Sequence, residues 1–349
     1  MRFRNPSVNV VTLAVALVAL GVAAFALGGT SSTTYQQAIA YTQTRPAFTV
    51  KRTVEVASAG ALRSALANLR PGDHVVATAP FVVSGETIIK NRLSAPAELD
   101  LAGVRFVYSG GGNSPAVWIN NAENVWLFGG DASTTDRGNA CILDYGSQYV
   151  RWWGFTAHDC GGSGFSALTV KADVAHNDFQ GTIWKAGQNR RWDPHAEKGS
   201  GEHCAGEMAD AQTSYTFTGN RLAFYCHDIP VGGAFTFGFS RTPARPATGN
   251  VLYLKAVNMS FVSKIQTGGN GVELWGDTDR MGLDVKYVEC DNCQGRPFQA
   301  GGMFGDQNLH GVKVEYGRGT NINLNPRYHG QSAWDTKGGA VFENVAPTG

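Results

Sequence analysis

The chain has 349 residues, of which 43% are hydrophobic and 16% are charged, and its formal net charge is +1. A chain of this length and apolar content can bury a large core, which excludes an intrinsically disordered protein. The small net charge argues against a strongly basic surface for polyanions, so we expect no nucleic-acid partner.

The N-terminus carries the pattern of an export signal. Arg2 and Arg4 precede an uncharged apolar run from Val10 to Leu27, and small polar residues follow. Ala24 and Ala26 form a small-x-small cleavage pattern, yet eighteen apolar residues are also close to the minimum for a spanning helix. We therefore predict a signal peptide or membrane anchor over 1–29, a linker over 30–53 and a single domain over 54–349. Either alternative makes the domain extracellular, secreted or attached to the membrane only through an uncleaved N-terminal segment.

The domain begins with a helix pattern followed by a turn. Leu62, Leu66 and Leu69 recur at helical spacing, and the sequence Pro71-Gly72 ends the pattern before a short strand. This arrangement resembles the opening of the pectate-lyase-like (pectin-lyase-like) superfamily, in which a short helix caps the first coil and a "PGD" turn leads into it. The resemblance implies an all-β fold, a right-handed parallel β-helix (solenoid) with a short N-terminal capping helix. It extends to the superfamily and to no specific family.

Internal repeats support the same fold over most of the chain. Seven segments align as a strand, a polar turn and a second strand; they begin with "PAVWIN", "ACILDY", "GFSALT", "HCAGEM", "AFTFGF", "GVELWG" and "AGGMFG". Long amphipathic helices between the strands are missing from the pattern, which argues against a doubly wound α/β sheet. A β-sandwich or a propeller stays open as an alternative, because alternation alone does not determine topology.

Six cysteines suit an oxidising compartment. Two pairs, Cys141 with Cys160 and Cys204 with Cys226, are separated by nearly one coil, so we predict two disulfides that join neighbouring coils. The "CxxC" of Cys290 and Cys293 lacks a second pair of zinc ligands, so we interpret it as a stapled turn.

The alignment also predicts which residues face inward, because side chains alternate along a strand. The predicted inward pairs are Val117/Ile119, Cys141/Leu143, Cys204/Gly206, Phe235/Phe237 and Val272/Leu274. Their neighbours would face outward, and small residues among them would form a shallow floor between Trp118 and Trp275. Aromatic faces beside carboxylates are typical of sugar binding, although outward tryptophans also pack under loops.

Two insertions would build the wall of a cleft above this floor, one from Trp184 to His203 and one from Ser240 to Asn250. The candidate substrate-binding residues are Trp118, Asp144, Trp192, His195, Glu202, Arg241, Trp275 and Asp277. A merely solvated turn is the alternative for the first insertion. We predict no metal site there, because the eight-residue spacing of His195 and His203 matches no recognised ligand geometry.

Three functions remain open for such a cleft. The first is a glycoside hydrolase that uses paired carboxylates, Glu207 and Glu273, with Asp228 as a third candidate and Lys198 and His203 in support. The second is a polysaccharide lyase acting by β-elimination, for which calcium or arginine would neutralise a uronate carboxylate. The third is a non-catalytic glycan-binding or surface protein. In each case we expect a polysaccharide or cell-wall glycan as the partner, and no cofactor other than calcium in a lyase.

Overall fold

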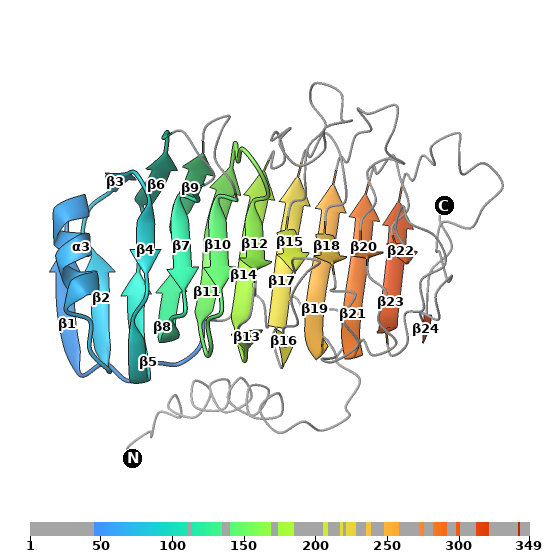
Figure 1. The fold of residues 1–349 in the computed structure, drawn as a ribbon, viewed down its shortest axis with the longest axis horizontal. Coiled ribbons are helices and arrows are strands. Elements are labelled where there is room, and N and C mark those ends of the chain that lie inside the picture. The colour runs from blue at the N-terminus through green and yellow to red at the C-terminus, as the bar shows by residue number, and fades with distance from the viewer. Residues whose placement is uncertain are drawn as a thin grey trace, which may run out of the picture. The chain divides into compact units, whose positions relative to one another are not determined.

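The protein is a stack of parallel strands, each coil laid on the one before it (Figure 1). This computed structural model describes residues 45–110, 114–134, 140–168, 174–184, 205–208, 217–218, 221–227, 235–238, 248–257, 272–275, 282–291, 298–300, 312–320 and 341–342. Every strand pair in these ranges is parallel, and strands that follow one another in a sheet come from successive coils. The predicted β-solenoid is therefore confirmed, and the sandwich and propeller alternatives are wrong.

The described strands form two long sheets and one short pair. The 14-stranded sheet, called sheet A here, contains β1 (Arg52–Val56), β2 (Asp73–Ala77), β3 (Phe81–Ser84), β5 (Arg92–Asp100), β6 (Val104–Tyr108), β8 (Glu123–Phe128), β9 (Asp131–Thr134), β11 (Arg151–His158), β14 (Asp178–Trp184), β17 (Arg221–His227), β19 (Thr248–Val257), β21 (Gly282–Asp291), β23 (Val312–Thr320) and β24 (Val341–Phe342). The 8-stranded sheet B contains β4 (Thr87–Ile89), β7 (Val117–Asn120), β10 (Ile142–Tyr145), β12 (Phe165–Leu168), β15 (Ala205–Met208), β18 (Phe235–Gly238), β20 (Val272–Trp275) and β22 (Phe298–Ala300). The short pair is β13 (Val174–Ala175) with β16 (Phe217–Thr218).

The strand register corrects the predicted facing of two repeats. Ile142 pairs with Val117 and Phe165, and Asp144 pairs with Ile119 and Ala167, so Ile142 and Asp144 hold the inward positions predicted for Cys141 and Leu143. In the fourth repeat Ala205 pairs with Phe235, so this repeat too is displaced by one residue. A slip of one residue exchanges the two faces of a strand, because side chains alternate with period two.

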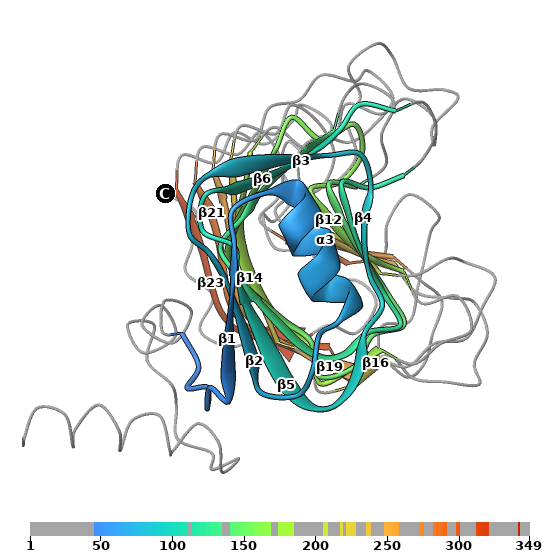
Figure 2. The ribbon, with the colours of Figure 1, turned by 90° about the vertical axis from the view of Figure 1, so that its left-hand side faces the viewer.

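Helix α3 (Ala59–Ala67) lies across the first-coil end of the stack (Figure 2). The Ser58 hydroxyl accepts a hydrogen bond from the Ala61 N–H at 3.2 Å and starts the helix. Leu62 and Leu66 are buried in the core. In the turn after the helix, Gly72 has φ of 86°, a conformation that favours glycine.

The last residues of the predicted linker lie against sheet A. The Arg45 guanidinium donates to Glu98 and to Asp100, and it covers the Phe128 ring at 4.1 Å. The Phe48 ring packs against Trp126 with centroids 5.9 Å apart. The chain is thus part of the fold several residues before β1 begins.

Sheet A bends in its early coils, where a break divides β8 from β9. Gly129 at this break has φ of 67°, and an added Cβ would lie 3.1 Å from backbone atoms of Ala102. In the next coil β11 continues through the bend as one strand, with Gly154 at φ of 64°. Glycine is required at the bend because L side chains rarely adopt this conformation.

Aromatic rings from four strands fill the core of the middle coils. Phe165 lies 4.6 Å from Phe179 and 5.4 Å from Phe224, measured between ring centroids, and Phe155 approaches Phe224 at 6.1 Å. All four side chains are fully buried. Such tilted contacts between rings stabilise the core beyond the area they bury.

A disulfide joins Cys141 and Cys160, as predicted, with their Cα atoms 5.3 Å apart. The geometry differs from the stacking expected between coils: Cys141 precedes β10 and Cys160 follows the end of β11, so the bond ties the two ends of one coil. Cys226 is also disulfide-bonded. Its predicted partner Cys204 lies outside the described residues.

The apolar segment from Val10 to Leu27 lies outside the described residues. In the ranges that the structure covers, no helix is long and apolar enough to cross a membrane.

We expect two single substitutions, one in the core and one at the surface, to differ greatly in their effect on the free energy of unfolding. Phe165→Ala should lower the free energy of unfolding by about 3–5 kcal/mol, because it leaves a cavity among the buried rings. Val82→Ala should change it by less than about 0.5 kcal/mol, since Val82 is 49% exposed. Urea unfolding followed by circular dichroism measures both values, and equal losses would contradict the assigned core.

Candidate functional site

The structure places the predicted catalytic pair on one sheet. Glu207 is on β15 and Glu273 is on β20, and β18 lies between these strands in sheet B. Glu207 falls at a bulge, where Gly206 and Glu207 together face the single residue Ser166 of β12. Glu273 pairs with Thr236 of β18. The remaining predicted catalytic residues, Lys198, His203 and Asp228, lie outside the described residues.

The predicted substrate-binding residues also lie partly inside and partly outside the described ranges. Trp118 is partly exposed on β7, and Trp275 is the last residue of β20. Five of the other predicted residues lie outside the described ranges: Trp192, His195, Glu202, Arg241 and Asp277. The sixth, Asp144, lies inside the core.

Asp144 is the clear error among these predictions, because its side chain is 0% exposed and faces the core. It accepts a hydrogen bond from the Asn177 amide at 3.0 Å, and its second oxygen has no hydrogen-bond partner. Burial raises the pKa of Asp144 to about 7. The carboxyl group therefore holds its proton in mildly acidic solution and has no access to a substrate.

Asn177 connects the turns of neighbouring coils around this buried acid. Its amide also donates to the Ser147 carbonyl at 2.9 Å, and its oxygen accepts from the Val150 N–H at 2.9 Å. In the preceding coil the Ser147 hydroxyl accepts from the Ala122 N–H at 3.2 Å. These bonds satisfy buried backbone groups at the corner between sheets B and A.

Another set of polar side chains lies on the outer side of sheet A. Alternation of buried and partly exposed residues in β9, β11, β14 and β17 shows which positions face outward. Strand pairing arranges these positions in two rows, which we call row 1 and row 2. Row 1 contains Arg105, Asp131, Thr156, Thr182 and Tyr225 and continues in register through Lys255, Glu289 and Arg318. Row 2 contains Ser133, His158, Trp184 and His227 and continues through Val257, Asp291 and Thr320.

Aromatic side chains meet in the middle of the two rows. The rings of Trp184 and His227 stack with centroids 3.6 Å apart and an interplanar angle of 9°. Tyr225 meets the His227 ring edge-on at 3.9 Å. All three side chains are partly exposed, so this part of sheet A offers a hydroxyl, an imidazole and an indole on one surface.

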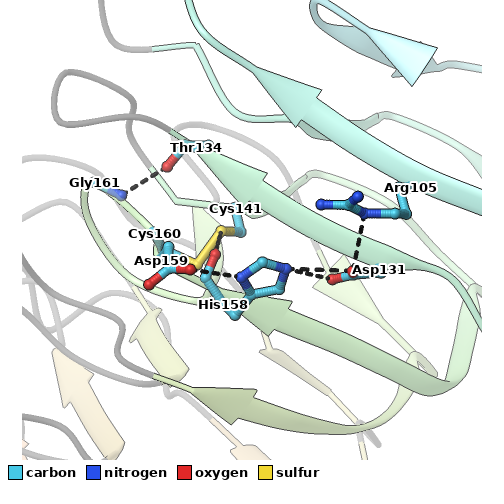
Figure 3. A network of polar contacts seen from close by, with 8 residues as sticks. All are labelled: Arg105, Asp131, Thr134, Cys141, His158, Asp159, Cys160 and Gly161. Carbon is cyan, nitrogen blue, oxygen red and sulfur yellow. Dashed lines mark hydrogen bonds and ion pairs between the residues drawn. A yellow bond between two sulfur atoms is a disulfide. The ribbon is translucent and has the colours of Figure 1, made fainter. Parts of the chain in front are cut away.

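A network of charged side chains occupies the first-coil end of the rows (Figure 3). The two ring nitrogens of His158 face different carboxylates: Nε2 lies 3.1 Å from Asp131 and Nδ1 lies 2.8 Å from Asp159. The Arg105 guanidinium lies 3.6 Å from Asp131 on the other side. Three successive coils therefore contribute to the same place: Arg105 from the first, Asp131 from the second, and His158 with Asp159 from the third.

Neighbouring positions in a row are about 4.8 Å apart, the spacing of hydrogen-bonded strands. A polymer lying along the solenoid axis would therefore meet one new pair of outward residues at every coil. Tyr225 and His227 carry groups that donate and accept protons, and Lys255 and Arg318 hold positions of the same row in the strand register. Within the described residues, no cluster of three or more His, Cys, Asp or Glu side chains could hold a metal ion.

The sequence alignment missed these rows because it followed the first strand of each repeat. The second strands carried the signal: "FYCH", "YLKAV", "YVECD" and "YGRGT" each hold a polar residue that strand pairing brings to the same register position. Aligning these segments would have placed Tyr225, Lys255, Glu289 and Arg318 in one row.

Comparisons with known proteins assign no family to the chain. No protein-family model matches it, and no curated protein matches it. Among solved structures it is similar to the crystal structure of an alginate lyase from Paenibacillus sp. strain FPU-7, with a TM-score of 0.46 and 12% sequence identity over 85% of this chain and 99% of that chain.

The raised pKa of Asp144 predicts that the free energy of unfolding falls as the pH rises. The pKa is about 7 in the folded chain and near the ordinary value of 3.8 in the unfolded chain, so the folded state binds the extra proton between these values. Its contribution is fully present below about pH 4, is lost as the pH approaches 7, and stays absent above it. Burial raises the pKa of Asp178 to about 7 as well, which adds a decline of the same sign.

Asp144→Asn should remove a large part of this pH dependence, because the amide carries no charge at any pH. Thermal melts between pH 4.5 and 8 measure the slope. Glu55→Gln, at an exposed position of β1, is the matched control and should keep the slope of the wild type. Identical slopes for wild type and Asp144→Asn would contradict the buried, protonated acid.

Proposed function

We propose that the chain is an extracellular enzyme that cleaves an acidic polysaccharide by β-elimination on rows 1 and 2 of sheet A. The observation that carries the proposal is the register of β17, β19, β21 and β23, which aligns Tyr225 with Lys255, Glu289 and Arg318. His227 stands beside Tyr225 at the end of β17. The Cys141–Cys160 disulfide supports an oxidising location.

β-Elimination requires the groups that these rows bring together. A base removes the proton next to the uronate carboxylate, the C–O bond of the glycosidic link breaks, and a C=C bond forms in the new end sugar. The departing oxygen receives a proton, so no water is consumed. In this proposal Tyr225 and His227 transfer the protons, and Lys255, at the register position of the next coil, stabilises the negative charge that develops on the carboxylate.

A second candidate is the hydrolase that the sequence predicts, with Glu207 and Glu273 as acid and base. The order β15-β18-β20 supports it, because two strand spacings amount to about 9.6 Å, only slightly more than the roughly 6.5–9.5 Å at which inverting enzymes hold their carboxyl groups. Hydrolysis would use sheet B and would leave no double bond in the product.

The products formed from a panel of acidic and neutral polysaccharides distinguish β-elimination from hydrolysis. We expect new reducing ends together with the ultraviolet absorbance of an unsaturated uronate. Reducing ends without this absorbance would favour the hydrolase, and neither signal would favour a glycan-binding protein. Parallel assays with a chelator and with added calcium would test whether calcium contributes.

Tyr225→Phe tests the role of the hydroxyl directly. It should lower kcat by about 10²-fold or more with little change in KM or thermal stability, because the ring stays and only the proton-transferring group is lost. Tyr149→Phe is the matched control, since Tyr149 is 45% exposed at the corner before β11 and stacks on His176. Unchanged kcat in Tyr225→Phe would remove Tyr225 from the mechanism.

A further inference from the structure

The stack of Trp184 and His227 differs from the ring contacts of the core. Its centroids are 3.6 Å apart and its planes are 9° from parallel. Carbon atoms in contact are about 3.5 Å apart, so this separation leaves almost no lateral offset between the rings. In the core, by contrast, Phe165 and Phe179 are tilted by 47° with centroids 4.6 Å apart. The Trp184–His227 pair is therefore a face-to-face stack.

A face-to-face stack is unfavourable for two neutral aromatic rings. Each ring has a negative face and a positive edge, so neutral pairs shift sideways or tilt. A cation reverses this preference, because the face of an indole attracts positive charge more strongly than that of any other side-chain ring. Histidine becomes such a cation when its imidazole takes up a proton. The geometry thus fits an imidazolium over an indole better than a neutral imidazole.

A second histidine stack in the protein provides an internal comparison. His176 stacks on Tyr149 with planes 13° from parallel, but the centroids are 4.8 Å apart. At a ring separation of about 3.5 Å, this corresponds to a lateral offset of about 3 Å, which is the arrangement that neutral rings prefer. Close stacking without offset is thus a property of the His227 position and not of surface histidines in this chain.

We infer that Trp184 is a positioning residue that holds His227 as an imidazolium, and that His227 is the proton donor of the proposed elimination. The inference rests on the proposed function, since it divides the two proton transfers between His227 and Tyr225. Trp184 reaches His227 from the preceding coil, because β14 and β17 pair in register at these two residues. Strand pairing therefore sets the stack.

The other groups near His227 act in different directions on its proton. Tyr225 lies perpendicular to the imidazole, with centroids 3.9 Å apart. In the following coil the register partner of His227 is the apolar Val257, and Lys255 pairs with Tyr225. A cation at the Lys255 position opposes protonation, whereas the carboxyl group of Asp228, the next residue of the chain, favours it. Asp228 lies outside the described residues, so the experiment has to separate its effect from that of Trp184.

An imidazolium at this place supplies the proton that elimination requires. The glycosidic oxygen takes the N–H proton of His227 as the C–O bond breaks, which leaves a neutral imidazole. Tyr225, as the phenolate, takes the proton next to the uronate carboxylate, and the electron pair of that C–H bond forms the C=C bond. Transfer of this proton from Tyr225 to His227 then restores both groups without a further reactant.

NMR titration of the histidine rings in the full chain, without substrate, tests the stack. The His227 signals are identified by their loss in His227→Gln. Trp184→Leu should lower the midpoint of the His227 titration by about 0.5 pH unit, because the cation loses the indole face. Trp184→Phe should retain part of the shift. If the indole only shielded a neutral imidazole from water, Trp184→Leu would raise the midpoint instead.

Two controls accompany this titration. His176, followed in the same spectra, should keep its midpoint in every Trp184 variant. Trp118→Leu removes another partly exposed tryptophan, on β7 of sheet B, and should leave the His227 titration unchanged. Thermal melts establish that each variant is folded. The inference is overturned if Trp184→Leu raises the midpoint or leaves it unchanged, including the case in which only Asp228→Asn lowers it.

The pH dependence of kcat separates the role of His227 from the reaction itself. A proton donor acts below its midpoint, so kcat should fall as the pH rises through it, and in Trp184→Leu this fall should begin about 0.5 pH unit lower. A lowered midpoint without any unsaturated product would support the imidazolium and contradict the elimination. Unsaturated product with a kcat profile that Trp184→Leu does not move would support the elimination and contradict His227 as the donor.

Discussion

The parallel pairing of one coil with the next is the constraint on which the rest of this structure depends. Each residue pairs with one residue per coil, so a side chain that faces outward once begins a row with members about 4.8 Å apart. Phe155, Phe165, Phe179 and Phe224 meet in the core because successive strands deliver them there. The same pairing aligns Tyr225, which is partly exposed, with the position of Lys255. The register of the strands therefore determines both the packing of the core and the arrangement of the candidate site.

A stack of parallel strands must also satisfy the backbone groups at its corners. At the corner between sheets B and A, the Asn177 side chain bonds the Val150 N–H and the Ser147 carbonyl, and it donates to the buried Asp144. An ionised acid at that place would lack a cation among the contacts that the structure describes, so burial keeps the acid protonated instead. The fold thus contains a titratable group that plays no part in catalysis. Its protonation state and the stability of the coil are linked.

The fold could be predicted from local signals, whereas the site could not. The leucine spacing of α3, the turn at Gly72 and the repeated strand pairs are short patterns that survive variation in loop length. It was harder to predict which side chains face the core. The segment "ACILDY" fits an alternation of inward and outward residues in two registers, and the usual exposure of aspartate favours the wrong one. Arg105, Asp131 and His158 come from three coils, and only the register shows that they meet. Contacts of this kind depend on the length of every intervening turn.

A net charge of +1 gives no general attraction for the acidic polymer that we propose as the partner. In the rows, basic and acidic residues occur at neighbouring positions: Arg105 lies beside Asp131, and Lys255 is in register with Glu289. Such pairing cancels the charge over distances longer than the Debye length of about 8 Å, while each cation still acts on a group in direct contact. A surface of this type does not attract polyanions in general. Under the proposed function, selectivity for a polymer therefore depends on the register of the coils and not on net charge.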